Sequence, residues 1–369
     1  MTKPHVLYLI GQLVRGGAEQ QLYNLLAHVE PGATVVSFSP DGYWADPIRA
    51  LGHTVIELER QGRVEVRRLR EVRHIIRQER PDLVYVFIDG ISGMYGRLGA
   101  LLAGHRHVIV GQRSHPTYFP RWYLRLMPWL NRAITAVICN SYAARDYLIE
   151  NGLAPARKLH VIHNGIDVAH IQATNATWPW PEDWRGKTVV GMVSHLTVPK
   201  SPETFIQLAA HIRQHHPEQA PDLRFALIGD GARRDEMAAL VDELGVKHVL
   251  WLAGEQTDIP ALLAHMDIFA LTSRNEGTPN AVMEAMCAGL PCVVTAAGDC
   301  PHIVVEGETG YIVPVGNVAQ LAERVLHLAH DATLRQRLGE RGAARMQQEF
   351  ALGVMARHYE DLFAQLFYT

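Results

Sequence analysis

Short, uninterrupted apolar segments alternate with helical patterns along nearly the whole chain, and this alternation restricts the fold more than any other feature. Strands are expected over residues 5–10, 33–39, 54–58, 83–88, 107–111, 136–140, 188–193, 223–229, 249–252, 268–271, 291–295 and 310–313. Helices are expected between them, among others over 19–28, 65–78 and 202–213. Strands that are apolar at successive positions are buried on both faces, so the pattern predicts parallel sheets covered by helices on both sides.

The alternation is broken over residues 173–186, which contain two prolines and no period, and we interpret this segment as an interdomain linker. The length of 369 residues agrees with two domains of about 150 residues or more each. The expected architecture is α/β, with two tandem doubly wound Rossmann-like domains facing across a cleft that holds the ligand. The expected parts are an N-terminal domain over 1–180, a C-terminal domain over 181–350, and a helix over 351–369 that crosses back to the first domain.

Composition restricts the class of protein further. Hydrophobic residues make up 48% and charged residues 20% of the chain, a balance typical of soluble globular proteins. We expect no signal peptide at the N-terminus, and no apolar stretch reaches the roughly 18 residues of a membrane span. Cys139, Cys287, Cys292 and Cys300 form no Cys-x-x-Cys pair, which favours free thiols in the cytoplasm.

Residues 273–284 carry the strongest functional signal. They follow an expected strand; Glu276 lies in the loop, and Thr278 with Pro279 is a favourable start for a helix that contains Glu284. The free N–H groups at the start of that helix would favour an anion. A carboxylate beside an anion site is well placed to bind sugar hydroxyls next to a diphosphate, although acidic residues are also common at helix starts that bind nothing.

The same segment resembles a known enzyme family. Glu276 and Glu284 stand eight positions apart, with Gly277 after the first and Glu-Ala-Met at the second. This is similar to the Glu-x7-Glu motif of the family 4 retaining glycosyltransferases, which have the two-domain GT-B fold. The resemblance implies that Glu276 contacts the donor sugar and that Glu284 binds the ribose of the nucleotide. By the same resemblance, the donor site would include Gly277, Thr278, Pro279 and Asn280.

Other turns match motifs by which the family holds its donor. Lys200 stands where a lysine binds the diphosphate, but His195 replaces the usual arginine and Ser201 the usual glycine. A histidine lacks the fixed bidentate hydrogen-bonding geometry of arginine, so this departure weakens the expected binding of the diphosphate. Further donor-binding candidates, all in strand-to-helix turns, are Gly16, Gly17, Gly231, Arg234 and Gly254.

The first domain is expected to supply the acceptor side. Arg113 and His115 follow an expected strand where family members often place a histidine or an arginine, so both are catalytic candidates beside Glu276. Asp89, at the end of another expected strand, is a weaker candidate. Arg113 and His115 each fit a surface loop without a substrate contact equally well.

Charge is unevenly distributed: residues 1–185 contain 21 Lys/Arg and 16 Asp/Glu, whereas the remainder contains 14 and 22. The arginine-rich stretch 60–80 and the basic and aromatic stretch 121–132 are either solvated helix faces or a peripheral contact with an anionic membrane, as a lipid-linked acceptor would require. The net charge of −3 and the absence of a binding module argue against nucleic acid as a partner.

The resemblance implies a retaining transfer of a hexose from a nucleotide-diphosphate sugar, UDP rather than GDP, to a hydroxyl of a sugar, glycan or lipid-linked acceptor in polysaccharide or glycolipid biosynthesis. We expect no cofactor and no metal, because the chain has no Asp-x-Asp and Lys200 with a helix N-terminus would stabilise the departing diphosphate. The alternatives on the same fold are a nucleotide-sugar epimerase-like enzyme and a non-catalytic sugar-nucleotide-binding protein.

Overall fold

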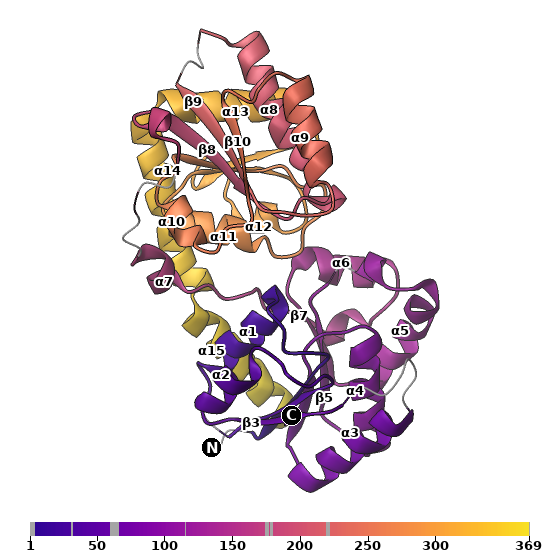
Figure 1. The fold of residues 1–369 in the computed structure, drawn as a ribbon. Coiled ribbons are helices and arrows are strands. Elements are labelled where there is room, and N and C mark those ends of the chain that lie inside the picture. The colour runs from indigo at the N-terminus through magenta and orange to yellow at the C-terminus, as the bar shows by residue number, and fades with distance from the viewer. Residues whose placement is uncertain are drawn as a thin grey trace. The chain divides into compact units, whose positions relative to one another are not determined.

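The computed structural model describes residues 4–30, 32–59, 66–114, 116–173, 177, 180–218 and 222–368. The chain divides into two compact units (Figure 1), of which the first comprises Met1–Gly165 with Leu352–Thr369 and the second Ile166–Ala351. The expected boundary at 180–181 therefore falls inside the second unit. No helix among the described residues is long and apolar enough to cross a lipid bilayer.

The first unit is built on a seven-stranded parallel sheet with the order β3-β2-β1-β4-β5-β6-β7. Its strands are β1 (Val6–Ile10), β2 (Thr34–Ser37), β3 (Thr54–Glu57), β4 (Leu83–Val86), β5 (Val108–Gln112), β6 (Ala136–Cys139) and β7 (Leu159–Val161). Its helices are α1 (Gly17–Leu26), α2 (Ala45–Ala50), α3 (Val66–Glu79), α4 (Ile91–Leu102), α5 (Arg121–Ala133), α6 (Tyr142–Glu150) and α15 (Leu352–Tyr368). Two separate apolar cores, one on each face of this sheet, account for the near-continuous apolar strands.

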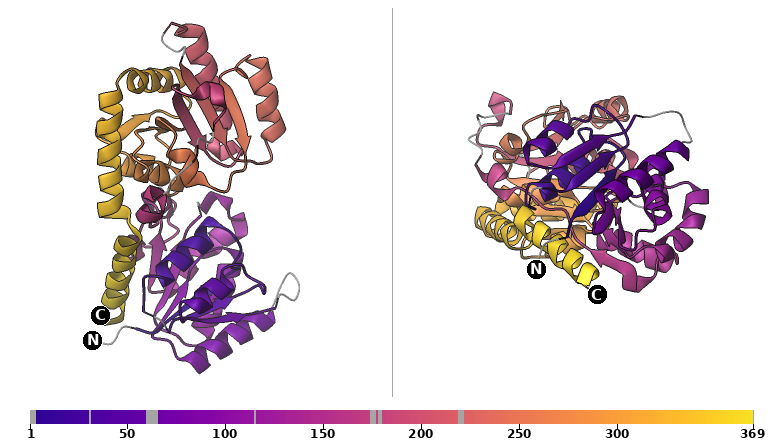
Figure 2. Two further views of the ribbon diagram at one scale, coloured as in Figure 1. Left: turned by 60° about the vertical axis from the view of Figure 1, so that its left-hand side comes forward. Right: turned by 90° about the horizontal axis from the view of Figure 1, so that it is seen from below.

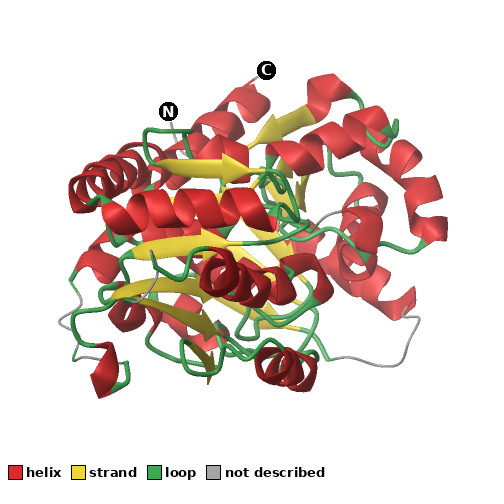
Figure 3. Cartoon of the chain, turned by 90° about the horizontal axis from the view of Figure 1, so that it is seen from above, coloured by secondary structure: helices red, strands yellow, loops and turns green. Residues whose placement is uncertain are grey.

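The second unit has a six-stranded parallel sheet with the order β10-β9-β8-β11-β12-β13. Its strands are β8 (Thr188–Val193), β9 (Leu223–Ile228), β10 (Leu250–Gly254), β11 (Ile268–Leu271), β12 (Cys292–Thr295) and β13 (Gly310–Val313). Its helices are α7 (Val168–Gln172), α8 (Pro202–His215), α9 (Arg234–Glu243), α10 (Ile259–Leu263), α11 (Asn280–Cys287), α12 (Cys300–Ile303), α13 (Val318–His330) and α14 (Ala332–Arg345). Figure 3 shows strands with helices on both sides, and the prediction of two tandem doubly wound α/β domains is confirmed.

The predicted linker 173–186 falls within the range of the second unit, and its residues 174–176, 178 and 179 lie outside the described residues. Trp180 and Trp184 are buried in the core of the second unit, stacked on each other with ring centroids 6.1 Å apart. The indole N–H of Trp180 donates to the carbonyl of His265 at 2.9 Å. The prolines and the missing period indicated a break in regular structure, but Trp180 and Trp184 anchor the described part of the segment, and the chain leaves the first unit at Gly165 instead.

The C-terminal helix α15 belongs to the first unit. Its apolar side chains Leu352, Met355, Tyr359, Leu362 and Phe363 are buried in one of that unit's two cores. Figure 2 shows α15, at the yellow end of the chain, running beside the indigo and purple elements of the first unit. The first unit is thus completed by residues that are more than 180 positions away from the rest of it in the sequence.

Candidate functional site

The strongest candidate site lies in the second unit, where the strand order reverses. Strands β8 and β11 are neighbours in the sheet, but the chain continues from β8 to β9 on one side and from β11 to β12 on the other. Ligands of doubly wound sheets bind at such a switch point. A cavity of about 540 Å³ opens there, beyond the carboxyl ends of the strands. Its polar and loop lining comprises Ser194, His195, Lys200, Asp230, Gly231, Glu255, Gln256, Glu276, Thr278, Pro279, Asn280 and Glu284.

Backbone contacts join the loops after β8 and β11. The backbone N–H groups of Arg274 and Asn275 both donate to the carbonyl of Pro199, at 2.8 and 3.2 Å. The Thr272 hydroxyl donates to the carbonyl of Ser201 at 3.0 Å. These bonds place the end of one loop against the end of the other, which brings together residues that are 76 positions apart in the chain.

An ion pair between Lys200 and Glu276 results from this contact. The Lys200 ammonium donates to Glu276 Oε2 at 2.6 Å, and the Ser273 hydroxyl donates to Glu276 Oε1 at 2.6 Å. The Glu276 side chain is 4% exposed and that of Lys200 30%. The carboxylate is therefore held in one orientation by two donors, while the ammonium keeps free N–H groups that can reach a ligand in the cavity.

Gly298, in the loop after β12, permits this arrangement. It has a φ of +53°, and a Cβ at this position would lie 2.1 Å from the carbonyl oxygen of Glu276. A side chain there would collide with backbone and would also strain the glycine's own conformation. A glycine that touches the peptide of Glu276 thus fixes the position of the carboxylate, although it lies 22 residues downstream.

Glu284 lines the same cavity from helix α11. No described residue provides a cation beside it, and burial raises the pKa of Glu284 to about 7. The helix begins at Asn280 with Pro279 as its N-cap, whereas the sequence placed the cap at Thr278. Pro279 has the non-helical angles φ −80° and ψ 83°. The backbone N–H of Asn280 donates to the carbonyl of Thr278, and those of Val282 and Met283 donate to the carbonyl of Pro279, which leaves the N–H of Ala281 as the free donor of the first turn among the described contacts.

The turn after β9 brings backbone to the cavity. Gly229 has a φ of +132°, and a Cβ on it would lie 2.0 Å from the carbonyl oxygen of Ser194, so the turn requires glycine. The Ser194 hydroxyl is buried in the cavity wall and has no hydrogen-bond partner among the described residues.

Arg234, a predicted donor-binding residue, pairs with Asp230 at 2.9 Å. Its guanidinium lies beside Gly254, another predicted position, but neither residue lines the cavity. Gly277 is also absent from the lining. His195 lines the cavity and is exposed. The cavity therefore contains His195, Lys200, Gly231, Glu276, Thr278, Pro279, Asn280 and Glu284 from the predicted set.

The remaining predicted residues belong to the first unit. Gly17 begins α1, with Gly16 as its N-cap. Arg113 donates to Asn164 Oδ1 at 3.1 Å and to the Tyr359 hydroxyl at 2.7 Å, with its guanidinium 3.8 Å from the centre of the Phe87 ring. These contacts connect Arg113 to α15 within the unit. His115 lies outside the described residues.

The weaker candidate Asp89 is occupied by structural contacts. It accepts a hydrogen bond from Arg97 at 2.9 Å and another from the Tyr123 hydroxyl. The Arg97 side chain is fully buried and also donates to Asn131 at 3.1 Å. A buried carboxylate with these donors connects α4 and α5 to the end of β4.

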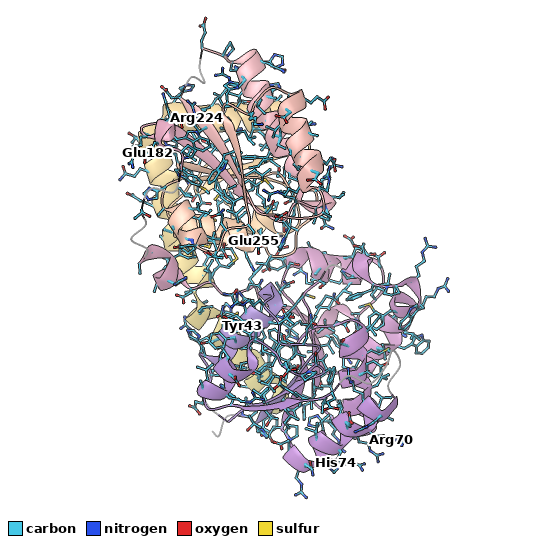
Figure 4. The ribbon with its side chains drawn as sticks, in the orientation of Figure 1. Tyr43, Arg70, His74, Glu182, Arg224 and Glu255 are labelled. Carbon is cyan, nitrogen blue, oxygen red and sulfur yellow. The ribbon has the colours of Figure 1, made fainter. Side chains whose placement is uncertain are left out.

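Sequence reasoning missed several cavity and support residues. Ser194, Asp230, Glu255 and Gln256 stand in the turns after β8, β9 and β10, and position after a strand was the available signal. Figure 4 labels Glu255, which is exposed. Ser273 and Gly298 act through Glu276, and only the folded structure reveals that contact. Among the described residues, no three His, Cys, Asp or Glu side chains are grouped as metal ligands.

Two protein families match this chain, one in each half of the sequence. The family described as "Glycosyltransferase Family 4" matches residues 15–170, and the family described as "Glycosyl transferases group 1" matches residues 176–345. The second match contains the whole Lys200–Glu276–Glu284 constellation.

The sequence identity between this chain and two individual relatives is 30% and 26% over the aligned residues. The N-acetyl-alpha-D-glucosaminyl L-malate synthase of Bacillus anthracis is 30% identical over 38% of this chain and 37% of its own length, so the match spans well under half of that protein. The UDP-Gal:alpha-D-GlcNAc-diphosphoundecaprenol alpha-1,3-galactosyltransferase of Escherichia coli is 26% identical over 70% of this chain and 69% of its own. Among solved structures, Anabaena HepE in complex with UDP superposes with a TM-score of 0.83 at 23% identity, covering 98% of this chain and 100% of that one.

Proposed function

The chain belongs to the family 4 glycosyltransferases of the GT-B fold, and we propose from this premise that it transfers the sugar of a UDP-sugar to an acceptor hydroxyl in polysaccharide or glycolipid biosynthesis, with UDP as the leaving group. The observation that carries the proposal is the buried Glu276 carboxylate, oriented by Lys200 and Ser273 inside a cavity at the switch point. The similar Escherichia coli enzyme is named for UDP-Gal and a lipid-linked acceptor, and HepE was solved with UDP and with UDP-glucose.

In this proposal the diphosphate binds to a cation and hydrogen-bond donors that line the cavity. Lys200 supplies a cation with free N–H groups, the first turn of α11 supplies the backbone N–H of Ala281, and the unpartnered hydroxyl of Ser194 lies in the wall. Backbone amides and a fixed ammonium stabilise charge that develops on a departing diphosphate without reorganisation. In this proposal the transfer uses neither a metal nor a cofactor, and His195 contributes at most one hydrogen bond where the family has arginine.

The sugar would lie against Glu276. Two of the carboxylate's acceptor positions are filled by Lys200 and Ser273, and the others can accept hydrogen bonds from sugar hydroxyls. The negative charge would also stabilise the positive charge that develops on the sugar ring as the bond to the diphosphate breaks. We propose that a hexose is transferred with retention of anomeric configuration, by front-side attack of an acceptor hydroxyl on a sugar, glycan or lipid-linked carrier.

Ionisation of Glu284 should make the binding of UDP depend on pH. A ribose diol donates two hydrogen bonds to a carboxylate, so the nucleotide should bind the ionised form, and burial raises the pKa of free Glu284 to about 7. The fraction ionised falls from about nine tenths at pH 8 to about one tenth at pH 6, so we expect the UDP dissociation constant to rise about tenfold between them. Titration calorimetry at the two pH values measures this.

The variant Glu284→Gln separates this carboxylate from other titrating groups. It should bind UDP weakly at both pH values, because one amide cannot accept from both hydroxyls as a carboxylate does. A 2′-deoxy-UDP should lose most of the pH dependence on the native protein. If Glu284→Gln keeps the full tenfold change, another group causes it, and the ribose assignment is wrong.

A thermal-shift panel of UDP-, GDP- and ADP-sugars, with the free nucleotides, tests the donor. Binding at one hundred times the dissociation constant stabilises the native state by about 2.7 kcal/mol, which is several degrees in melting temperature. We expect the largest shift with UDP and UDP-sugars. No shift with any nucleotide would refute the proposal, and a shift without turnover across a wide acceptor panel would favour a non-catalytic sugar-nucleotide-binding protein.

A further inference from the structure

Helix α5 of the first unit exposes an unusual group of large apolar side chains. Trp122, Leu126 and Trp129 are 47%, 45% and 70% exposed, and their spacing of four and three residues places them on one stripe of the helix. Two tryptophans and a leucine lie together in water, although single exposed apolar residues are the normal case. Such a stripe indicates a contact surface.

The opposite face of α5 is fixed to the body of the unit. Tyr123, Met127 and Asn131 are buried, and their spacing of four residues places them on one stripe. The Tyr123 hydroxyl donates to the buried Asp89, and the Asn131 side-chain amide donates to the carbonyl of Leu153 at 2.9 Å. The exposed tryptophans are therefore presented by a helix whose rotation about its axis is set by buried hydrogen bonds.

An arginine stripe runs beside the apolar one. Arg121, Arg125 and Arg132 are all exposed, and Arg132 lies 5.8 Å from the ring centre of Trp129. The helix has no acidic residue, and residues 90–145 contain seven arginines and no Asp or Glu. The surface that α5 presents is thus apolar along one stripe and positive along the next.

We propose that α5 docks the first unit on an anionic lipid bilayer, lying in the plane of the interface with Trp122, Leu126 and Trp129 in the headgroup and upper acyl region. Tryptophan is favoured at that depth, and arginines beside an inserted stripe meet the phosphates of anionic lipids. At 13 residues, or about 20 Å, the helix is too short to span a bilayer. This charge pattern favours a lipid surface over a second copy of the chain, because two α5 helices face to face would bring like charges together.

Vesicle co-sedimentation of the full chain at about 0.1 M salt tests the proposal, with phosphatidylcholine alone and with phosphatidylcholine containing phosphatidylglycerol. We expect binding to the anionic vesicles and at least tenfold weaker binding to the neutral ones. The triple variant W122S/L126S/W129S should lose at least tenfold in affinity for the anionic vesicles. The triple variant R121Q/R125Q/R132Q should lose roughly tenfold or more, since each arginine near the surface contributes to the attraction.

Two matched controls isolate α5. Leu102→Ser removes an equally exposed apolar side chain, 58% exposed, from α4 of the same unit. The variant R70Q/R73Q/R77Q removes the same charge from the exposed face of α3, where Figure 4 shows Arg70 projecting outward. Both controls should bind anionic vesicles within about threefold of the native chain.

Three outcomes would overturn the proposal. The first is no binding of the native chain to anionic vesicles. The second is equal losses for the α3 and α5 arginine variants, which would indicate diffuse charge attraction. The third is a concentration-dependent dimer in sedimentation that W122S/L126S/W129S abolishes while vesicle binding persists, which would assign the stripe to a second copy. Thermal shift with UDP checks the folding of every variant and the donor site independently, so failure of either proposal is recognised separately.

Discussion

Replacing Glu276 by glutamine is expected to lower the turnover of a UDP-sugar by about 10²–10³-fold, the usual effect of removing one preorganised electrostatic group from an active site. Glutamine has the same shape and can still meet Lys200 and Ser273, which hold the native carboxylate at 2.6 Å each. What it lacks is the negative charge that faces the sugar as positive charge develops. The affinity for UDP itself should change by less than about threefold, because UDP has no sugar in that position.

Glu203→Gln is the matched control for this experiment. Glu203 is also a partly buried, ion-paired glutamate of the second unit, 15% exposed, but its carboxylate faces Arg233 at 2.6 Å and Arg274 at 3.1 Å and does not line the cavity. Its replacement should lower the melting temperature and leave turnover per folded molecule within about twofold. Unchanged turnover in Glu276→Gln, measured as release of UDP with acceptor present, would show that Glu276 does not contact the donor sugar.

Much of the fold could be predicted because its signal is local. The strands of the second unit are short, mainly apolar segments, and parallel strands buried on both faces have this pattern wherever they occur. The strand order and the reversal between β8 and β11 are long-range properties with no such signal. They follow here from the general topology of doubly wound sheets.

The boundary between the units was mispredicted for a physical reason. A segment without helical or strand period can still be anchored, and Trp180 and Trp184 do this by burying their rings against Trp251. Nothing in the local sequence distinguishes a tryptophan that fills a core from one in a linker. The boundary at Gly165 likewise depends on the return of the chain at Leu352, nearly two hundred residues later.

The sequence predicted the part of the candidate site that belongs to one continuous motif. Glu276 and Glu284 lie in one motif, whereas Ser273 and Gly298 matter through contacts with Glu276 that no spacing rule gives. The sequence could not predict the contacts of Arg113. Position after a strand favoured a catalytic role, which stays a prediction, and the structure shows its guanidinium bonded to Asn164 and Tyr359 and stacked on Phe87.

Replacing Lys200 by methionine is expected to weaken UDP binding by about 10–100-fold, the loss of one charge-assisted hydrogen bond of roughly 1.5–3 kcal/mol, and to leave the weak binding of uridine unchanged. Methionine keeps most of the volume of the side chain and removes the cation. Calorimetry with UDP and with uridine measures the difference, since only UDP presents a diphosphate. Equal losses for the two ligands would mean that Lys200 supports the shape of the cavity and does not bind the diphosphate.

The same variant should also change the stability of the free protein with pH. Without Lys200, the buried carboxylate of Glu276 keeps only the Ser273 donor, and a buried charge without its cation destabilises the folded state. Protonation at low pH removes that charge, so the loss of stability should be greatest at high pH. We expect Lys200→Met to be destabilised by about 2 kcal/mol at pH 8, below the usual cost of a broken buried pair because Lys200 is 30% exposed, and by much less at pH 4.5.

The double variant K200M/E276Q makes this test decisive. Removing both charges together leaves no unpaired carboxylate, so stability at pH 8 should return to within about 1 kcal/mol of the native protein, with the pH dependence lost. Turnover should remain as low as in the single variants, because neither the diphosphate cation nor the sugar-facing anion is present. Urea unfolding of the native protein, Lys200→Met, Glu276→Gln and the double variant at pH 4.5 and pH 8 gives the coupling energy between Lys200 and Glu276. A coupling near zero would mean that the Lys200–Glu276 pair does not hold the free site together.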